Sequence, residues 1–337
     1  MLQAKPSKNW TGVVVVSVAL LGVLAAIGLR RDDSQEVPDS YLYDLTELRK
    51  TDPRLILYRE TQRLGTGFRR AFAIAISNDG LPMVAVDQAI RVFDESGRVV
   101  LDIPLSGQPT CLAYGPGDQI YVGIRDHIEV FDEKGALCSR WDPPGDGALL
   151  TSIAVSDKGV FVADAGRRVV IRYAEDGSII RVIDDEGSAG ETPRFVIPHP
   201  QFDLAVGKDG DLHIANPGRH RVEKYTVQGL LSGYWGAVSM GIEGFAGCGN
   251  PANFSLLSDG RYVTCEKGLP RVKIYSPEGV FAGVVAGAEL FPKYNAERIS
   301  TGQIGELDVA VDAKDRILVL DSTENSVRVF VENSSKN

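Results

Sequence analysis

The stretch TSIAVSDKGVFVADAGRRVVIRYAEDG, residues 151–177, contains three apolar segments separated by a short acidic turn and a bend. Branched and aromatic residues dominate the segments, while Asp, Gly and Lys occupy the first turn, as in antiparallel strands joined by tight connections. The third segment ends in an aromatic residue, Tyr173. The stretch therefore predicts three consecutive strands of one antiparallel sheet.

This pattern recurs six times along the chain. The copies begin at intervals of 38 to 55 residues, at Phe72, Thr110, Thr151, Phe202, Ala252 and Leu307. A repeat of this length built only from strands is typical of propeller blades, which bury their apolar faces against one another. We therefore predict an all-β, six-bladed β-propeller over residues 54–333, in which the first strand of each repeat lines a central channel.

The two ends of the repeat array indicate how the ring closes. The sixth copy supplies only three strands before the polar tail at residues 334–337. The apolar run RLILYR, residues 54–59, precedes the first copy and has no hairpin partner of its own. We predict that this run pairs as the outer strand of blade six, so that neither the first nor the last blade has an open edge.

The N-terminal part has a different character. Residues 12–29 are uncharged and apolar, and are long enough to cross the hydrocarbon layer of a membrane. They follow a short tail, residues 1–11, and precede Arg30 and Arg31. A cleaved signal peptide and a buried helix are the alternatives, but the small-residue cleavage pattern is poor and the flanks are basic. We predict a transmembrane signal anchor, a stalk over residues 30–53, and a propeller on the extracytoplasmic (periplasmic or extracellular) side.

The composition and the motifs limit which classes of partner and cofactor we expect. The formal net charge is −9 and no basic stripe is present, so a phosphate backbone has no electrostatic basis for binding. The propeller sequence contains no Walker loop, Gly-x-Ser-x-Gly elbow or CxxC motif. We expect no nucleic-acid partner and no cofactor, apart from a weakly supported divalent cation.

Two segments carry a family resemblance. VADAGRRVVIRYAEDG and HIANPGRHRVEKYTVQG resemble the NHL repeat, in which a strand ending in Val-Ala-Asp is followed by a short bend and a strand ending in an aromatic residue before Asp-x-x-Gly. All six copies can be aligned with this pattern, and copies three and four match it best. The resemblance implies a six-bladed NHL-type propeller. It implies little about activity, because this fold hosts binding modules, lyases, lactonases and scaffolds.

The fifth repeat is the least regular. A loop with Cys248 and Asn250 enters its first strand. A bend with Cys265, Glu266 and Lys267 leaves its second strand, so antiparallel pairing places both segments on one face of the ring. The two cysteines could form a disulfide, bind a soft metal with outside ligands, or remain unlinked.

Long connections precede repeats four, five and six and emerge on this same face. Long loops on a rigid frame often carry function, although loop-on-loop packing is the alternative. We predict that this face of blades three to six contacts a protein partner or a membrane complex. Its further candidates are the ring-bearing residues Phe195, His199, Trp235, Phe245 and Tyr294.

Oxygen-bearing residues raise a metal hypothesis. Asp203, Asn253 and Asp308 lie near the starts of first strands and could face the channel, where gluconolactonase- and regucalcin-like propellers bind a divalent cation. They are weak candidates, because that family's metal-binding segments are missing. We expect the residues that end second strands to accept hydrogen bonds from their own bends instead. These are Asp164, Asn216, Glu266 and Asp321.

NHL-type amidating lyases have a zinc site that needs three converging ligands. The four histidines of this chain are too scattered to suggest such a site; they are His127, His199, His213 and His220. The sequence therefore favours a membrane-tethered, extracytoplasmic, protein-binding NHL-type scaffold. The alternative is a divalent-metal-dependent lyase or lactonase-like enzyme that uses the central channel. No catalytic residue is identified.

Overall fold

The computed structural model describes residues 47–183, 195–294 and 306–333. These residues belong to one compact unit, Thr46–Asn337. The predicted anchor at residues 12–29 lies outside the described residues, as does most of the predicted stalk. No helix in the described part is long and apolar enough to cross a membrane.

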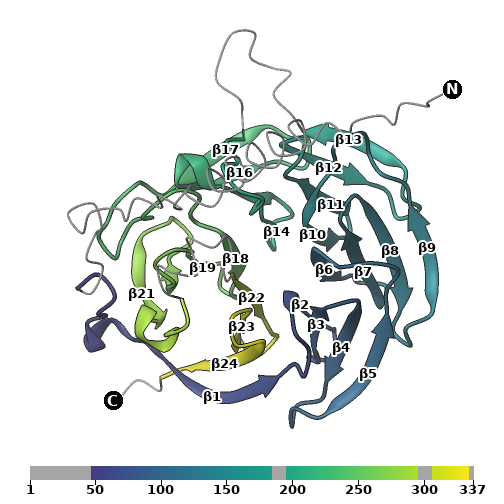
Figure 1. Ribbon diagram of the computed structural model, residues 1–337. Helices are drawn as coiled ribbons and strands as arrows, with labels where there is room; N and C mark the ends of the chain where they lie inside the picture. Colours follow the sequence, from purple (N-terminus) through teal and green to yellow (C-terminus); the bar gives the residue numbers. More distant parts are fainter. Residues whose placement is uncertain (1–46, 184–194, 295–305, 334–337) are drawn as a thin grey trace, which may run out of the picture. The chain divides into compact units, whose positions relative to one another are not determined.

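The described residues form six four-stranded antiparallel sheets around a central channel, which confirms the predicted six-bladed propeller (Figure 1). In each blade the first strand of the repeat is innermost and the other three follow outward. Blade one consists of β2 (Ala71–Ile76), β3 (Pro82–Val86), β4 (Ala89–Phe93) and β5 (Val99–Pro104). Blade two consists of β6 (Cys111–Tyr114), β7 (Gln119–Ile124), β8 (His127–Asp132) and β9 (Leu137–Trp141).

The remaining blades keep this order from channel to perimeter. Blade three consists of β10 (Leu150–Ser156), β11 (Gly159–Asp164), β12 (Val169–Tyr173) and β13 (Ile179–Ile183). Blade four consists of β14 (Leu204–Val206), β15 (Leu212–Asn216), β16 (Arg221–Tyr225) and β17 (Leu231–Trp235). Blade five consists of β18 (Asn253–Leu256), β19 (Tyr262–Cys265), β20 (Val272–Tyr275) and β21 (Phe281–Ala286). Blade six consists of β22 (Leu307–Val311), β23 (Ile317–Asp321), β24 (Ser326–Glu332) and the N-terminal β1 (Tyr58–Gly65).

An N-terminal strand closes the ring, as predicted, but its residues differ from the predicted ones. Figure 1 shows β1 beside β24, and the pairing runs antiparallel from Tyr58 opposite Glu332. The prediction placed this strand at residues 54–59. The structure instead folds Pro53–Leu55 into a 3-10 turn, and the Leu57 N–H donates to the Val284 carbonyl at 2.9 Å. The apolar run therefore begins by covering β21 of blade five, and pairing with β24 starts only after it.

Every outermost strand has a register shift of the β-bulge kind beside an aromatic residue at or near the end of the neighbouring strand. A bulge leaves one residue unpaired and bends the strand, which makes an edge a poorer template for another chain. The aromatic residues themselves are buried between blades, and burying each ring contributes about 2–3 kcal/mol. They are Phe93, Phe131, Tyr173, Tyr225, Tyr275 and Phe330.

Candidate functional site

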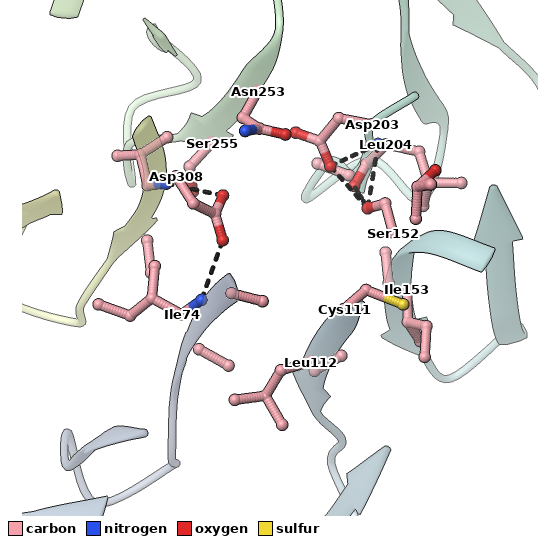
Figure 2. A pocket seen from close by; sticks show the side chains of 18 of the residues that line it. Ile74, Cys111, Leu112, Ser152, Ile153, Asp203, Leu204, Asn253, Ser255 and Asp308 are labelled. Carbon is pink, nitrogen blue, oxygen red and sulfur yellow. Dashed lines mark hydrogen bonds between the residues drawn. The ribbon is translucent and has the colours of Figure 1, made fainter. Parts of the chain in front are cut away.

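The innermost strands of all six blades line a cavity of about 470 Å³ in the channel. Figure 2 shows Asp203, Asn253 and Asp308 on one side of this cavity and Cys111 and Leu112 on the other. The side formed by blades four to six is thus polar, while the side formed by blades one and two is mostly apolar. The three weak metal candidates do lie at the channel, as the positions of the repeats indicated.

Asp203 joins three blades by hydrogen bonds. Its Oδ1 accepts from the Ser152 hydroxyl at 2.6 Å and from the Leu204 N–H at 2.9 Å. Its Oδ2 accepts from the Phe254 N–H of blade five at 2.7 Å. One buried carboxylate therefore fixes the spacing of blades three, four and five at the channel.

Asp308 repeats this arrangement between blades six and one. Its Oδ1 accepts from the Val309 N–H at 2.8 Å, and its Oδ2 from the Ile74 N–H at 2.9 Å. Between them, the Asn253 amide donates to the Leu307 carbonyl at 2.8 Å and links blade five to blade six. Side chains at one position of the repeat thus tie consecutive blades together.

Burial changes the acidity of both carboxyl groups. Desolvation raises the pKa of Asp203 to about 6, against its hydrogen bonds, which lower it. Desolvation and, to a smaller extent, the neighbouring Asp203 charge raise the pKa of Asp308 to about 7. The channel therefore takes up protons near neutral pH.

A chain of polar contacts lies at the channel entrance and includes two residues that sequence reasoning missed. The Lys267 ammonium donates to the Gln201 side-chain oxygen at 3.0 Å, and the Gln201 amide donates to the Glu306 carboxylate. Burial raises the pKa of Glu306 and lowers that of Lys267 to about 8. Gln201 and Glu306 immediately precede the starts of repeats four and six, where copies two and five have Pro109 and Pro251. That contrast is the signal that could have revealed them.

The two candidate segments of blade five do come together. The Asn250 side chain accepts from the Lys267 N–H at 2.9 Å and donates to the Lys267 carbonyl at 3.1 Å. Cys248 is exposed and Cys265 is buried, and both are free thiols. The two cysteines therefore do not form the disulfide that was one of the three alternatives.

Glu266, another predicted binding-face residue, is enclosed in the core of blade five. Its side chain accepts from Arg271 Nε at 2.6 Å and lies 3.3 Å from the Lys273 ammonium. All three side chains are at most 3% exposed, so this cluster is not available to a partner. The cluster has a structural role, because the loss of one partner would leave an unpaired buried charge at a cost of several kcal/mol.

Most of the ring-bearing candidates point into the protein. Phe195, Phe245 and Tyr294 are buried, and Trp235 is partly buried against Tyr262 at 4.6 Å between ring centroids. The prediction of an aromatic surface is therefore wrong for Phe195, Phe245 and Tyr294, whose buried rings anchor the long connections to the core. His199 is exposed. Among the described residues of these connections, the large exposed apolar side chains are Val238, Met240 and Leu290.

The residues that end second strands hold main-chain N–H groups, and two of the four, Asp164 and Asp321, hold groups of their own bends as expected. Asp164 accepts from Arg167 N of its bend at 3.1 Å. Asp164 also accepts from Leu149 N at 2.9 Å, and Asn216 accepts from Val196 N at 3.0 Å. In these last two contacts the donor belongs to the connection that enters the blade. Glu266 does the same with Ala246 N, whereas Asp321 accepts from Thr323 N and Glu324 N of its own bend.

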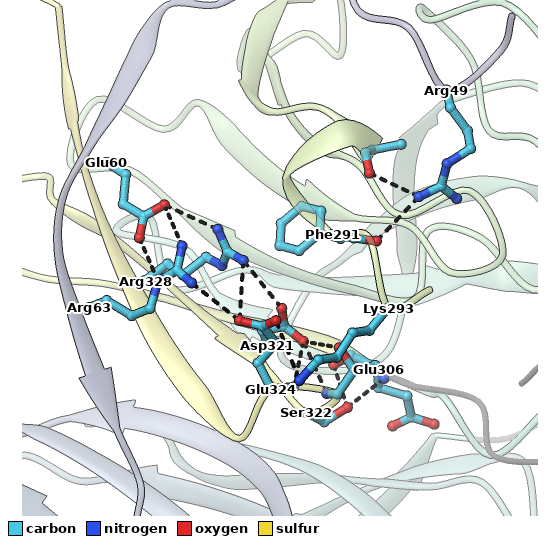
Figure 3. A network of polar contacts seen from close by, with 12 residues as sticks. Arg49, Glu60, Arg63, Phe291, Lys293, Glu306, Asp321, Ser322, Glu324 and Arg328 are labelled. Carbon is cyan, nitrogen blue, oxygen red and sulfur yellow. Dashed lines mark hydrogen bonds and ion pairs between the residues drawn. The ribbon is translucent and has the colours of Figure 1, made fainter. Parts of the chain in front are cut away.

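The channel entrance is continuous with the contacts that close the ring (Figure 3). The Glu306 N–H donates to the Ser322 hydroxyl at 2.7 Å. Close by, the buried Arg328 guanidinium lies 3.1 Å from Glu60 of β1 and 3.7 Å from Asp321. The N-terminal strand, the last blade and the entrance are thus part of one polar network.

No protein-family model matches the chain, and no curated protein matches it in sequence. The chain is similar to a solved structure of streptogramin B lyase, with 11% identity, a TM-score of 0.54, and coverage of 84% of this chain and 100% of the other. It is also similar to a protein of unknown function from Bacteroides caccae, with 14% identity, a TM-score of 0.50, and coverage of 69% and 84%. At these identities the likeness shows a shared fold and carries no activity with it.

Proposed function

We propose that this protein is a membrane-tethered NHL-type propeller that acts outside the cytoplasm as a protein-binding scaffold. The observation that carries the proposal is that the polar side chains in the channel hold the blades together. The side chains of Asp203, Asn253 and Asp308 form hydrogen bonds with the main chain of neighbouring blades. Such contacts serve to hold a rigid ring on which connections are displayed.

The proposed contact surface consists of residues 236–252, before blade five, and residues 287–294, the described part of the connection before blade six. Val238 and Met240 are 71% and 52% exposed, and Leu290 is also exposed. Exposed apolar side chains beside polar neighbours such as Glu243 and Glu289 are typical of protein interfaces. This surface replaces the buried aromatic residues as the basis for partner binding.

Site-specific photo-crosslinking tests the scaffold proposal. A photoreactive amino acid at Met240, in the full-length chain in its native membranes, should give one discrete protein adduct. The control position is Val100 on the outer strand of blade one, which is 54% exposed and should give none. Adding Val238→Asp should remove the adduct at Met240. No adduct, or equal adducts at both positions, would contradict the proposal.

The second candidate, a metal-dependent lyase or lactonase, rests on the carboxylates at one end of the channel. Across residues 47–183, 195–294 and 306–333, no group of three or more His, Cys, Asp or Glu side chains is placed to hold a metal ion. The side chains of Asp203, Asn253 and Asp308 are already hydrogen-bonded to the main chain of neighbouring blades, and we derive no reaction from a metal ion at this site. Metal analysis of the purified full-length protein separates the two functions: a stoichiometric divalent metal lost in Asp308→Asn would favour the enzyme.

A further inference from the structure

A second cavity lies at the opposite end of the innermost strands from the channel carboxylates. It has a volume of about 720 Å³ and lies between the turns that follow β14, β18 and β22 in blades four, five and six. Small-molecule sites commonly have volumes of about 300–1,000 Å³. Neither the scaffold proposal nor the metal hypothesis uses this cavity.

His213 lies in the wall of this cavity and is only 7% exposed. Its Nδ1 is 2.9 Å from the Tyr262 hydroxyl, and the two rings meet edge to face at 5.5 Å. Because a phenol is a stronger acid than a neutral imidazole N–H, we assign the Tyr262 hydroxyl as the donor to Nδ1, which places the imidazole proton on Nε2. Burial also lowers the pKa of His213 to about 4, which keeps the ring neutral at physiological pH.

The Nε2–H group has no partner among the described residues. It lies over Gly207, where a Cβ atom would be only 2.7 Å from Nε2. Glycine at this position therefore leaves the imidazole edge open to the cavity. A neutral hydrogen-bond donor that faces a cavity without a protein partner is a group that a ligand oxygen can satisfy.

The ionic groups of the lining already have partners. The Lys224 ammonium lies 2.7 Å from Asp209, and the Lys208 ammonium donates to the Ser258 carbonyl. Asp315 accepts from both the N–H and the hydroxyl of Ser258. A charged ligand would have to compete with these contacts. A hydroxyl-rich ligand would not, because a carboxylate bound to one cation keeps lone pairs that accept further hydrogen bonds.

Asp259 and Asp312 also belong to the lining, and its apolar part includes Leu256, Pro277 and Val311. One donor, several carboxylate acceptors and an apolar wall are complementary to a molecule with hydroxyl groups and a hydrocarbon face. We propose that this cavity binds a neutral polyhydroxylated ligand of the sugar class, with the His213 Nε2–H donating to one of its oxygens.

Imidazole NMR of the full-length chain tests this site directly. The protein is labelled with ¹⁵N-histidine and purified in a detergent without a sugar headgroup. The probes are glucose, galactose, mannose and N-acetylglucosamine, with butylamine and butyrate as charged comparators. At least one sugar should shift the His213 signal saturably, while the signal of His127 in blade two stays unchanged and the comparators have no effect.

Two glycine substitutions provide a matched pair. Gly207→Ala places a methyl group against both His213 and the Asp209 carboxylate of the cavity and should weaken sugar binding at least about tenfold. Gly233→Ala on β17 has no atom within 4 Å of the new Cβ and should bind as the wild type does. Failure of all four sugars to move the His213 signal overturns the proposal, as does a saturable shift from a charged comparator instead. The wild-type titration decides the question even if Gly207→Ala fails to fold.

Discussion

Asp203 and Asp308 show how one side chain can serve both architecture and proton uptake. Each bridges its own strand and the innermost strand of the next blade through main-chain N–H groups. An ionised carboxylate accepts these bonds well, but burial penalises its charge. The two effects oppose each other, and the raised pKa values of about 6 and about 7 show that desolvation dominates.

The stability of the propeller should therefore depend on pH through these two groups. Their ordinary pKa is 3.8, so each binds its proton more tightly in the folded chain. The stabilisation is complete below about pH 4, declines as the pH rises, and is lost above about pH 6 for Asp203 and about pH 7 for Asp308. For Asp203 it amounts to about 3 kcal/mol.

Urea unfolding at pH 4.5 and pH 8 measures this effect. The wild type should lose stability relative to Asp203→Asn, and relative to Asp308→Asn, as the pH rises, because the variants cannot ionise there. The difference between the wild type and each variant cancels the contributions of other groups. One of these is the buried neutral His213, whose contribution to stability is lost as the pH falls. Parallel pH profiles for the wild type and both variants would show that these carboxyl groups do not set the dependence.

Among the elements, β1 is the one on which the ring depends. It supplies the fourth strand of blade six, and its Glu60 meets Arg328, whose side chain is 3% exposed. Arg328 also faces Asp321, which is fully buried. A buried cation between carboxylates from two chain segments makes this seam sensitive to the loss of one partner.

Arg328→Met should lower the free energy of unfolding by about 3–5 kcal/mol, because Asp321 keeps a buried charge without its counter-ion. The control is Arg63→Met in the same network, where the guanidinium is 44% exposed and the expected loss is below about 1 kcal/mol. Chemical denaturation of both variants measures the difference. Equal losses would mean that the burial of Arg328 has no energetic consequence.

The periodic sequence pattern was sufficient for the six blades and for closure by an N-terminal strand. It misplaced that strand because the apolar run at residues 54–59 begins by covering blade five, and apolar content does not reveal which blade a segment contacts. The pattern also placed Asp203, Asn253 and Asp308 at the channel, since equivalent repeat positions share an environment. It could not find Gln201 and Glu306, which lie in the irregular connections. Aromatic composition alone did not distinguish buried anchors such as Phe245 from surface contacts.

For the whole molecule, the cysteines provide a test of sidedness. Cys138 and Cys248 are exposed, whereas Cys111 and Cys265 are buried. If the propeller lies outside the cytoplasm, a membrane-impermeant maleimide added to intact cells should modify two thiols per chain. Cys138→Ser and Cys248→Ser should each reduce the count to one. Labelling that appears only after lysis would place the propeller in the cytoplasm.

The pairing of β1 with β24 also sets the order in which the molecule can be completed. Glu60 and Arg328 are 268 residues apart, so the first strand to leave the ribosome is the last to find its partner. At about 5–20 residues per second, that partner arrives roughly 10–50 seconds later. During this interval five blades can assemble while the seam stays open, so a chain that stops short of blade six would expose an unpaired strand for quality-control factors to detect.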